Sequence, residues 1–110
     1  MRSTSPATGV MASLLPPGAV SVRRTPEFSE SSIPTALRHR HATKAGVWGL
    51  IQVIEGSLTY RILEPTPNET TLTSDRPGVV EPGRLHEVEA SGPVRFFVEF
   101  FEIPSAAAGT

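Results

Sequence analysis

The sequence contains no cysteine, which excludes disulfides and thiolate metal ligands. Any bound metal would therefore depend on histidine and carboxylate side chains. The formal net charge is −1, and the basic patch typical of proteins that bind nucleic acid or anionic membranes is missing. No apolar run approaches the roughly 20 residues that span a bilayer. We therefore expect a cytoplasmic protein with no nucleic-acid partner and no membrane partner.

Common catalytic motifs are absent as well. The chain contains no Gly-rich phosphate loop, no nucleophile elbow and no Ser-His-Asp order. The side chains left to carry chemistry are three histidines, with nearby carboxylates and a lysine.

Proline and glycine, by contrast, are frequent, at 11 and 9 of 110 residues. Such turn formers suit many short strands better than a few long helices. Hydrophobic residues make up 38% and charged residues 19%, which is a globular composition. We expect one domain over residues 15–103, a disordered N-terminal tail over residues 1–14 and a C-terminal tail over residues 104–110.

Apolar and β-branched residues form short runs separated by Gly or Pro turns. The expected strands cover residues 20–24, 47–54, 58–62, 69–73, 79–81, 86–90 and 94–102. One helical turn at most fits residues 35–38. Several short strands at close, even spacing are typical of a β-sandwich or a closed barrel.

The first candidate site is the run His39-Arg40-His41. In a strand, residues i and i+2 share a face, so two imidazoles there could chelate one divalent ion. The alternative is a pair of exposed histidines in a basic loop. Local sequence leaves both interpretations open.

His86 begins a strand after the Pro82-Gly83 turn. Alternation puts His86 on the apolar side with Val88 and Ala90. A single inward histidine is usually a core residue with satisfied hydrogen bonds, and it becomes a ligand where other donors point toward it.

Glu99 lies in the strongest strand pattern of the chain, VRFFVEFFE. It shares one face with Phe97 and Phe101, and a carboxylate among large aromatics is costly to bury unless it is paired or metal-bound. The alternatives are a solvent-exposed face or a pairing with Arg95. Lys44 could bind an anionic ligand or be solvated, and Trp48 could be core or pocket wall.

Two segments together resemble the two halves of a cupin. HATKAGVWGLIQVIEGSLTYRI is similar to the first half, with Gly56 between two strands, and PGVVEPGRLHEVEASGPVRFFVEFF is similar to the second, in which a Pro-Gly turn leads to an inward histidine. More closely, the ordered motifs resemble the TehB/YeaR-like domain, a small cupin-like family. The resemblance implies a single all-β domain, a cupin-like double-stranded β-helix or jelly-roll barrel.

The resemblance also implies a metal site in the barrel mouth. Carried over to this chain, the ligands would be His41, His86 and Glu99, and the metal zinc or iron. Metal-binding cupins usually place an acid a few residues after the first histidines, but Ala42–Gly49 contains none, and Lys44 stands near that position. Family members also occur fused to a methyltransferase linked with tellurite resistance, which suggests a stress-related role.

Three functions stay open. We predict a metal- or small-ligand-binding protein, with His39, Lys44 and Trp48 as further pocket residues. The alternatives are a small zinc or non-haem iron enzyme with dioxygenase-like chemistry, and a structural module whose histidines are simply packed. The apolar face of residues 94–100 leads us to expect a homo-oligomer, in the form of a homodimer.

Overall fold

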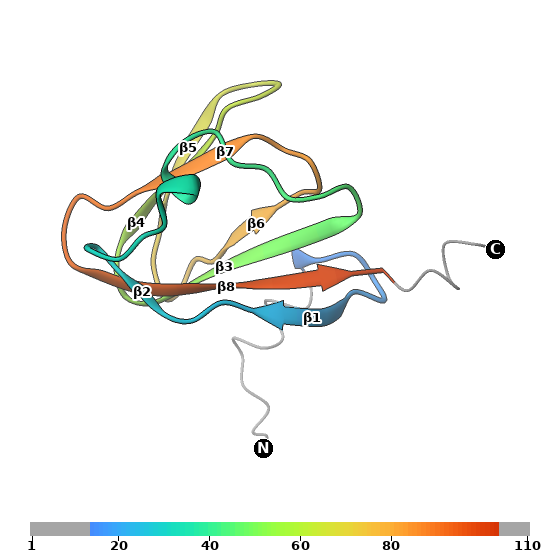
Figure 1. The fold of residues 1–110 in the computed structure, drawn as a ribbon, viewed down its shortest axis with the longest axis horizontal. Helices are drawn as coiled ribbons and strands as arrows, with labels where there is room; N and C mark the ends of the chain where they lie inside the picture. Colours follow the sequence, from blue (N-terminus) through green and yellow to red (C-terminus); the bar gives the residue numbers. More distant parts are fainter. Residues whose placement is uncertain (1–13, 104–110) are drawn as a thin grey trace, which may run out of the picture.

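The computed structural model describes residues 14–103 and is built almost wholly from strands (Figure 1). The strands are β1 (Val20–Arg24), β2 (Phe28–Ser29), β3 (Val47–Gly56), β4 (Leu58–Ile62), β5 (Asn68–Leu72), β6 (Gly78–Val80), β7 (His86–Glu89) and β8 (Val94–Glu102), and η1 (Thr35–Arg38) is a 3₁₀ helix. Within the described range, no helix is long and apolar enough to cross a membrane. The expected tails lie outside that range, apart from residue 14.

The larger sheet has the strand order β1-β8-β3-β6, and β2 also pairs with β8. Its longest pairing joins β3 to β8, with Ile51 opposite Val98 and Leu50 opposite Glu99. Because side chains alternate along a strand, the first pair and the second pair point to opposite faces of the sheet. The face that carries Ile51 and Val98 turns toward the second sheet.

The smaller sheet has the order β5-β4-β7. Tyr60 and Val88 lie opposite each other and are buried toward the larger sheet. On the outward face, Arg61 forms ion pairs with acidic side chains from both neighbouring strands. This face is therefore polar and solvent-facing, as expected for an antiparallel sheet with one covered face.

The core fills the space between the two facing sheets. The buried hydrophobic residues of this cluster are Ile33, Ile51, Val53, Leu58, Tyr60, Leu72, Val80, Val88, Val94, Phe96 and Val98. Phe96 has no exposed surface, and its ring meets the Phe28 ring edge-to-face with a centroid distance of 5.6 Å. Both sheets therefore contribute to one core.

A glycine makes the connection from β3 to β4 possible. Gly56 has φ of +82°, and a Cβ atom there would lie 2.1 Å from the Pro93 carbonyl oxygen. Only a residue without a side chain tolerates both the backbone conformation and this close approach.

The expected all-β class is confirmed. Each expected strand is present with bounds that shift by at most two residues, and the turn at residues 35–38 is η1. The short strand β2 was not predicted, because two residues ahead of a Ser-rich segment carry no alternation from which to recognise a strand.

Candidate functional site

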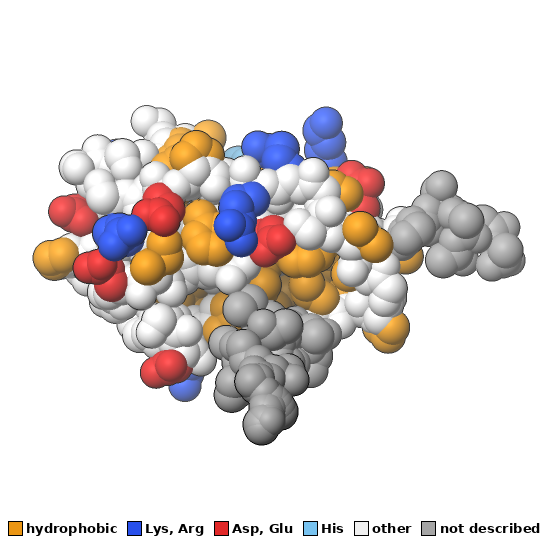
Figure 2. All heavy atoms as spheres, turned by 90° about the horizontal axis from the view of Figure 1, so that it is seen from below, with side chains coloured by type: hydrophobic (Ala, Val, Ile, Leu, Met, Phe, Trp, Pro, Cys, Tyr) orange, Lys and Arg blue, Asp and Glu red, His pale blue; other side chains and the backbone are white. Residues whose placement is uncertain are grey.

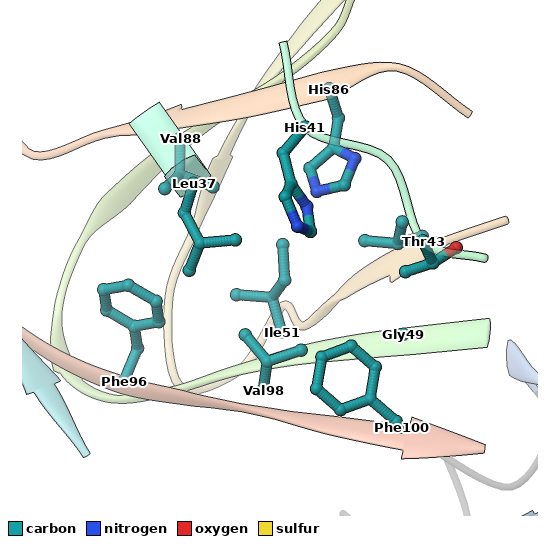
Figure 3. Close-up of a pocket in the computed structure, with 11 residues that line it drawn as sticks. Leu37, His41, Thr43, Gly49, Ile51, His86, Val88, Phe96, Val98 and Phe100 are labelled. Atoms are coloured by element: carbon teal, nitrogen blue, oxygen red, sulfur yellow. The ribbon is translucent and has the colours of Figure 1, made fainter. Parts of the chain in front are cut away.

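A small cavity lies between the two sheets, beside η1 (Figure 3). On one side Ile51, Val98 and Phe100 project from the larger sheet, and on the other His41 and His86 point inward. The volume is about 20 Å³, which is room for about one water molecule. Among the lining residues, the two imidazoles and one threonine hydroxyl supply the polar side-chain atoms.

An isolated antiparallel bridge brings the two histidines together. The His41 N–H donates to the His86 carbonyl at 2.7 Å, and the His86 N–H donates to the His41 carbonyl at 2.8 Å. Residues paired in this way carry their side chains on the same face. The bridge thus fixes both rings against the cavity, although they come from distant parts of the sequence.

His86 is held in one tautomer. It is 3% exposed, and alternation along β7 turns it inward as the sequence predicts. Its Nδ1 lies 3.0 Å from the Arg84 carbonyl oxygen. A carbonyl can only accept, so Nδ1 carries the hydrogen and Nε2 keeps a lone pair. The Tyr60 ring packs against His86 edge-to-face, with centroids 5.8 Å apart.

His41 contributes an unpartnered polar atom. Its ring meets His86 edge-to-face, with centroids 5.3 Å apart and planes at 88°. Its Nδ1 is buried and has no hydrogen-bond partner among the described residues. Leaving such an atom unsatisfied costs roughly 1–3 kcal/mol. A ligand or ion that reached this nitrogen would recover part of that cost.

Burial lowers the pKa of both imidazoles. For His41 the cause is desolvation. For His86 desolvation is also the largest cause, the hydrogen bond to the Arg84 carbonyl opposes it, and the neighbouring His41 lowers the pKa further. Both rings are therefore neutral at pH 7, the state in which imidazole can accept a hydrogen bond or bind a metal.

The cavity adjoins a larger pocket that opens to solvent. The outer pocket has a volume of about 470 Å³ and shares His41, Thr43 and Phe100 with the cavity. Its other lining includes Arg23 from β1 and Lys44 from the loop that precedes β3. A molecule in the outer pocket would therefore meet cationic side chains and the His41 ring together.

The loop that carries Lys44 is held by Thr43. The Thr43 hydroxyl donates to the Val47 carbonyl at 2.8 Å and accepts from the Gly83 N–H at 3.3 Å. Gly46, with φ of +83°, closes the turn in which the Val47 N–H donates to the Lys44 carbonyl. These bonds fix the loop between β3 and the Pro-Gly turn before β7.

His39 does not join His41 on a shared face. The expectation required an extended run, but Arg40 has φ of +40° and turns the backbone between them. His39 is the exposed C-cap residue directly after η1, and it lines neither pocket. The partner of His41 is His86 instead.

Glu99 does not point toward the histidines. It lies on the outer face of the larger sheet, opposite Leu50 in the β3–β8 register. There its carboxylate accepts hydrogen bonds from the Ser21 hydroxyl at 2.6 Å and from Gln52 Nε2 at 2.9 Å. Figure 2 shows this outer face, where hydrophobic side chains lie between basic and acidic ones. The pairing with Arg95 is also not formed, since Arg95 pairs with other glutamates.

Trp48 and Lys44 have different positions. Trp48 lies opposite Phe101 in the register, so its side chain is on the outer face and away from the cavity. Lys44 lines the outer pocket. Within residues 14–103, no group of three or more His, Cys, Asp or Glu side chains is placed to hold a metal ion.

Sequence reasoning did not single out Arg23 or Thr43. Arg23 reaches the pocket because β1 has an irregular register between Ser21 and Arg23, a feature that the sequence does not signal. Thr43 lies within the motif HATKAGVWG, but its role depends on contacts with distant residues. Phe100 could have been found, because alternation in β8 places it on one face with Phe96 and Val98.

Two facing antiparallel sheets with a histidine-lined cavity between them define a small cupin-fold protein. The TehB-like domain family model matches residues 23–98, well over half of the sequence. The chain belongs to the TehB-like domain family. No curated protein sequence matches it.

Solved structures share this fold. A crystal structure of an E. coli K12 protein is 24% identical with a TM-score of 0.73, and the match covers 82% of this chain and 96% of that one. TehB from Haemophilus influenzae is also 24% identical, with a TM-score of 0.74. That match covers 79% of this chain but 32% of TehB. Hydroxypropylphosphonic acid epoxidase from S. wedmorenis is 16% identical with a TM-score of 0.51, covering 76% of this chain and 43% of the epoxidase. The chain therefore corresponds to about a third of TehB.

Proposed function

We propose that this chain is a small-ligand-binding protein whose site is the His41/His86 cavity together with the outer pocket. The supporting observation is the buried, unpartnered Nδ1 of His41 beside a cavity that adjoins a larger open pocket. The cavity alone holds about one water molecule, so the body of a ligand would occupy the outer pocket. One polar group of the ligand would extend to His41.

The neutral state of the imidazoles supports this proposal. His86 Nδ1 bonds to the Arg84 carbonyl, so its Nε2 is an acceptor, and His41 can present either an N–H or a lone pair. The pair therefore suits a ligand hydroxyl, carboxyl or amide. The apolar wall opposite the rings adds burial of a short aliphatic segment, at about 25 cal/mol per Å² of apolar area removed from water.

The proposal can be tested with three-carbon probes. Propionate, propionamide and 1-propanol are titrated while the ring signals of ¹³C-labelled histidine are followed by NMR. We expect at least one probe to shift the His41 and His86 signals and to leave the His39 signals in place. His86→Phe keeps a ring of similar shape without nitrogen, and it should abolish the shift at His41.

His39→Phe is the matched control, because His39 is exposed and lines neither pocket. It should bind the probes as the native protein does. If no probe shifts the cavity histidines, or if His86→Phe binds as well as the native chain, this function is wrong.

A divalent metal is the second candidate occupant. A metal-binding histidine commonly donates its other ring N–H to a backbone carbonyl, as His86 does to Arg84. The donor set is nevertheless small, with two imidazoles and no third His or carboxylate among the described residues. Zinc or iron held by His41 and His86 would supply a Lewis acid at this site.

Zinc titration of the dialysed, tag-free protein separates the two candidates. Near-stoichiometric zinc that is lost in both His41→Ala and His86→Ala, and kept in His39→Ala, would favour the metal. Zinc binding by the native protein that is no tighter than in a variant carrying both His41→Ala and His86→Ala would leave small-ligand binding as the function. Oxygen uptake by the iron(II)-loaded protein with added probes would favour the metalloenzyme alternative.

A further inference from the structure

The outer pocket has a cationic rim built from two separate elements. Arg23 comes from β1 and Lys44 from the loop before β3, and both line the same space as His41. One carboxylate, that of Glu102, lines it as well. The rim therefore carries two positive charges against one negative charge.

Both cations lack a carboxylate partner within residues 14–103, although four other arginines form ion pairs there. Arg23 is held in place by an aromatic ring, since its guanidinium carbon lies 4.6 Å from the Phe100 ring centroid. This contact leaves the N–H groups of the guanidinium free to bind an anion side-on.

Lys44 is positioned by its backbone. The Thr43 hydroxyl and the Gly46 turn fix the loop on either side of it, while its side chain is exposed. The ammonium group can therefore reach toward the pocket from a fixed point. Unpaired cations on two fixed elements are a suitable arrangement for a ligand with a single anionic group.

We propose that the ligand of this site is a small organic anion, whose carboxylate or phosphonate group lies between Arg23 and Lys44. This inference rests on the proposed function, and it adds the chemical class of the ligand. The anionic end occupies the outer rim, and the remainder of the molecule extends past Phe100 to the His41 ring. The pocket volume of about 470 Å³ falls within the usual range for small-molecule sites.

The contribution of the ligand's negative charge to binding can be measured with two probes of nearly equal shape, one charged and one neutral. Propionate and the neutral propionamide are titrated in low-salt buffer, with methylphosphonate as a second anion, and backbone ¹H–¹⁵N shifts are followed. We expect either anion to shift the Thr43 and Lys44 amides and to bind at least about tenfold more tightly than propionamide. The tighter of the two anions identifies the head group.

Two charge-removing variants test the residues. Lys44→Met and Arg23→Met should each weaken anion binding about fivefold, and the double variant should remove the preference for propionate over propionamide. Raising the salt to about 0.5 M should weaken anion binding in the native protein and have little effect on propionamide. Arg76→Met removes the same charge from a turn that lines neither pocket, and it should bind as the native protein does.

If propionamide and propionate bind equally, in a manner that depends on His86, and the Lys44→Met and Arg23→Met variants are unchanged, the anion assignment is overturned while ligand binding stands. If none of the three-carbon probes reaches the cavity histidines, the proposed function is wrong, and this inference falls with it.

Discussion

The two faces of the larger sheet carry different chemistry, although they belong to the same strands. The inner face presents Ile51, Val98 and Phe100 to the cavity. The outer face carries Trp48, Phe97 and Phe101 around Glu99, whose carboxylate is held by Ser21 and Gln52. From residue types alone, the outer face would be predicted to hold the functional site, because a carboxylate lies there among aromatic side chains.

The candidate binding site therefore lies on the face of β8 that carries mainly apolar side chains. The inner residues of β8 contribute shape, and the polar groups come from His41 and His86 across the cavity. On the outer face the Glu99 carboxylate is accounted for by its hydrogen bonds to Ser21 and Gln52, and the Arg24 guanidinium stacks 4.4 Å from the neighbouring Phe97 ring centroid. Substitutions on the inner face are therefore expected to change stability and ligand binding more than substitutions on the outer face.

The largest expected difference is in stability. Phe96 has no exposed surface, and Phe96→Ala should lower the free energy of unfolding by about 3–5 kcal/mol. Phe97 is half-buried on the outer face, and Phe97→Ala should cost about 1–2 kcal/mol. Urea unfolding followed by circular dichroism measures both values. Equal losses would contradict the assignment of the two faces.

The second difference concerns self-association. The homodimer expected from sequence stays a prediction. The apolar face of β8 on which it was based faces the core, so the aromatic residues of β8 that could join two copies are Phe97 and Phe101 on the outer face. If that face joins two copies, Phe97→Ser with Phe101→Ser should weaken dimerisation at least about tenfold, or about 1.4 kcal/mol. Sedimentation velocity over a range of concentrations gives the answer. A native chain that stays monomeric at high concentration contradicts the homodimer.

The fold was largely accessible from the sequence, for a physical reason. Alternation and Gly/Pro turns are local signals, and they located the main strands and the inward side of His86. The spacing of His39 and His41 puts both on one face only if the segment is extended, and Arg40 adopts a left-handed conformation instead. The pairing of His41 with His86 and the outward direction of Glu99 depend on the arrangement of distant strands, which no local pattern contains.

A third test uses the pH dependence of stability. Burial lowers the pKa of His41 and His86 in the folded protein, so the unfolded chain binds more protons as the pH falls below about 6.5. Stability should therefore be complete above that pH, decrease as the pH falls through the window below it, and level off under the folded pKa values. The loss reflects the inner face, since the outer face holds no histidine.

Thermal unfolding between pH 8 and pH 5 measures this slope. His41→Gln and His86→Gln should each flatten it, and the double variant should remove most of it. His39→Gln, which changes an exposed histidine outside the cavity, should keep the native slope. A slope that survives in the double variant would mean that other groups cause it.

The smallest expected effect on stability and binding is that of substituting Glu99, the carboxylate that lies among aromatic residues in the sequence. Glu99→Gln keeps the shape of the side chain. Its amide oxygen can accept from Gln52 Nε2, and its amide N–H can donate to the Ser21 hydroxyl in place of the bond that hydroxyl now donates, so the change should alter stability by no more than about 1 kcal/mol. It should leave zinc and probe binding at the native level, because the carboxylate lies on the opposite side of the sheet from His41 and His86. Zinc titration beside His86→Ala makes the contrast direct. A loss of zinc in Glu99→Gln equal to that in His86→Ala would mean that the two faces of β8 act on one site.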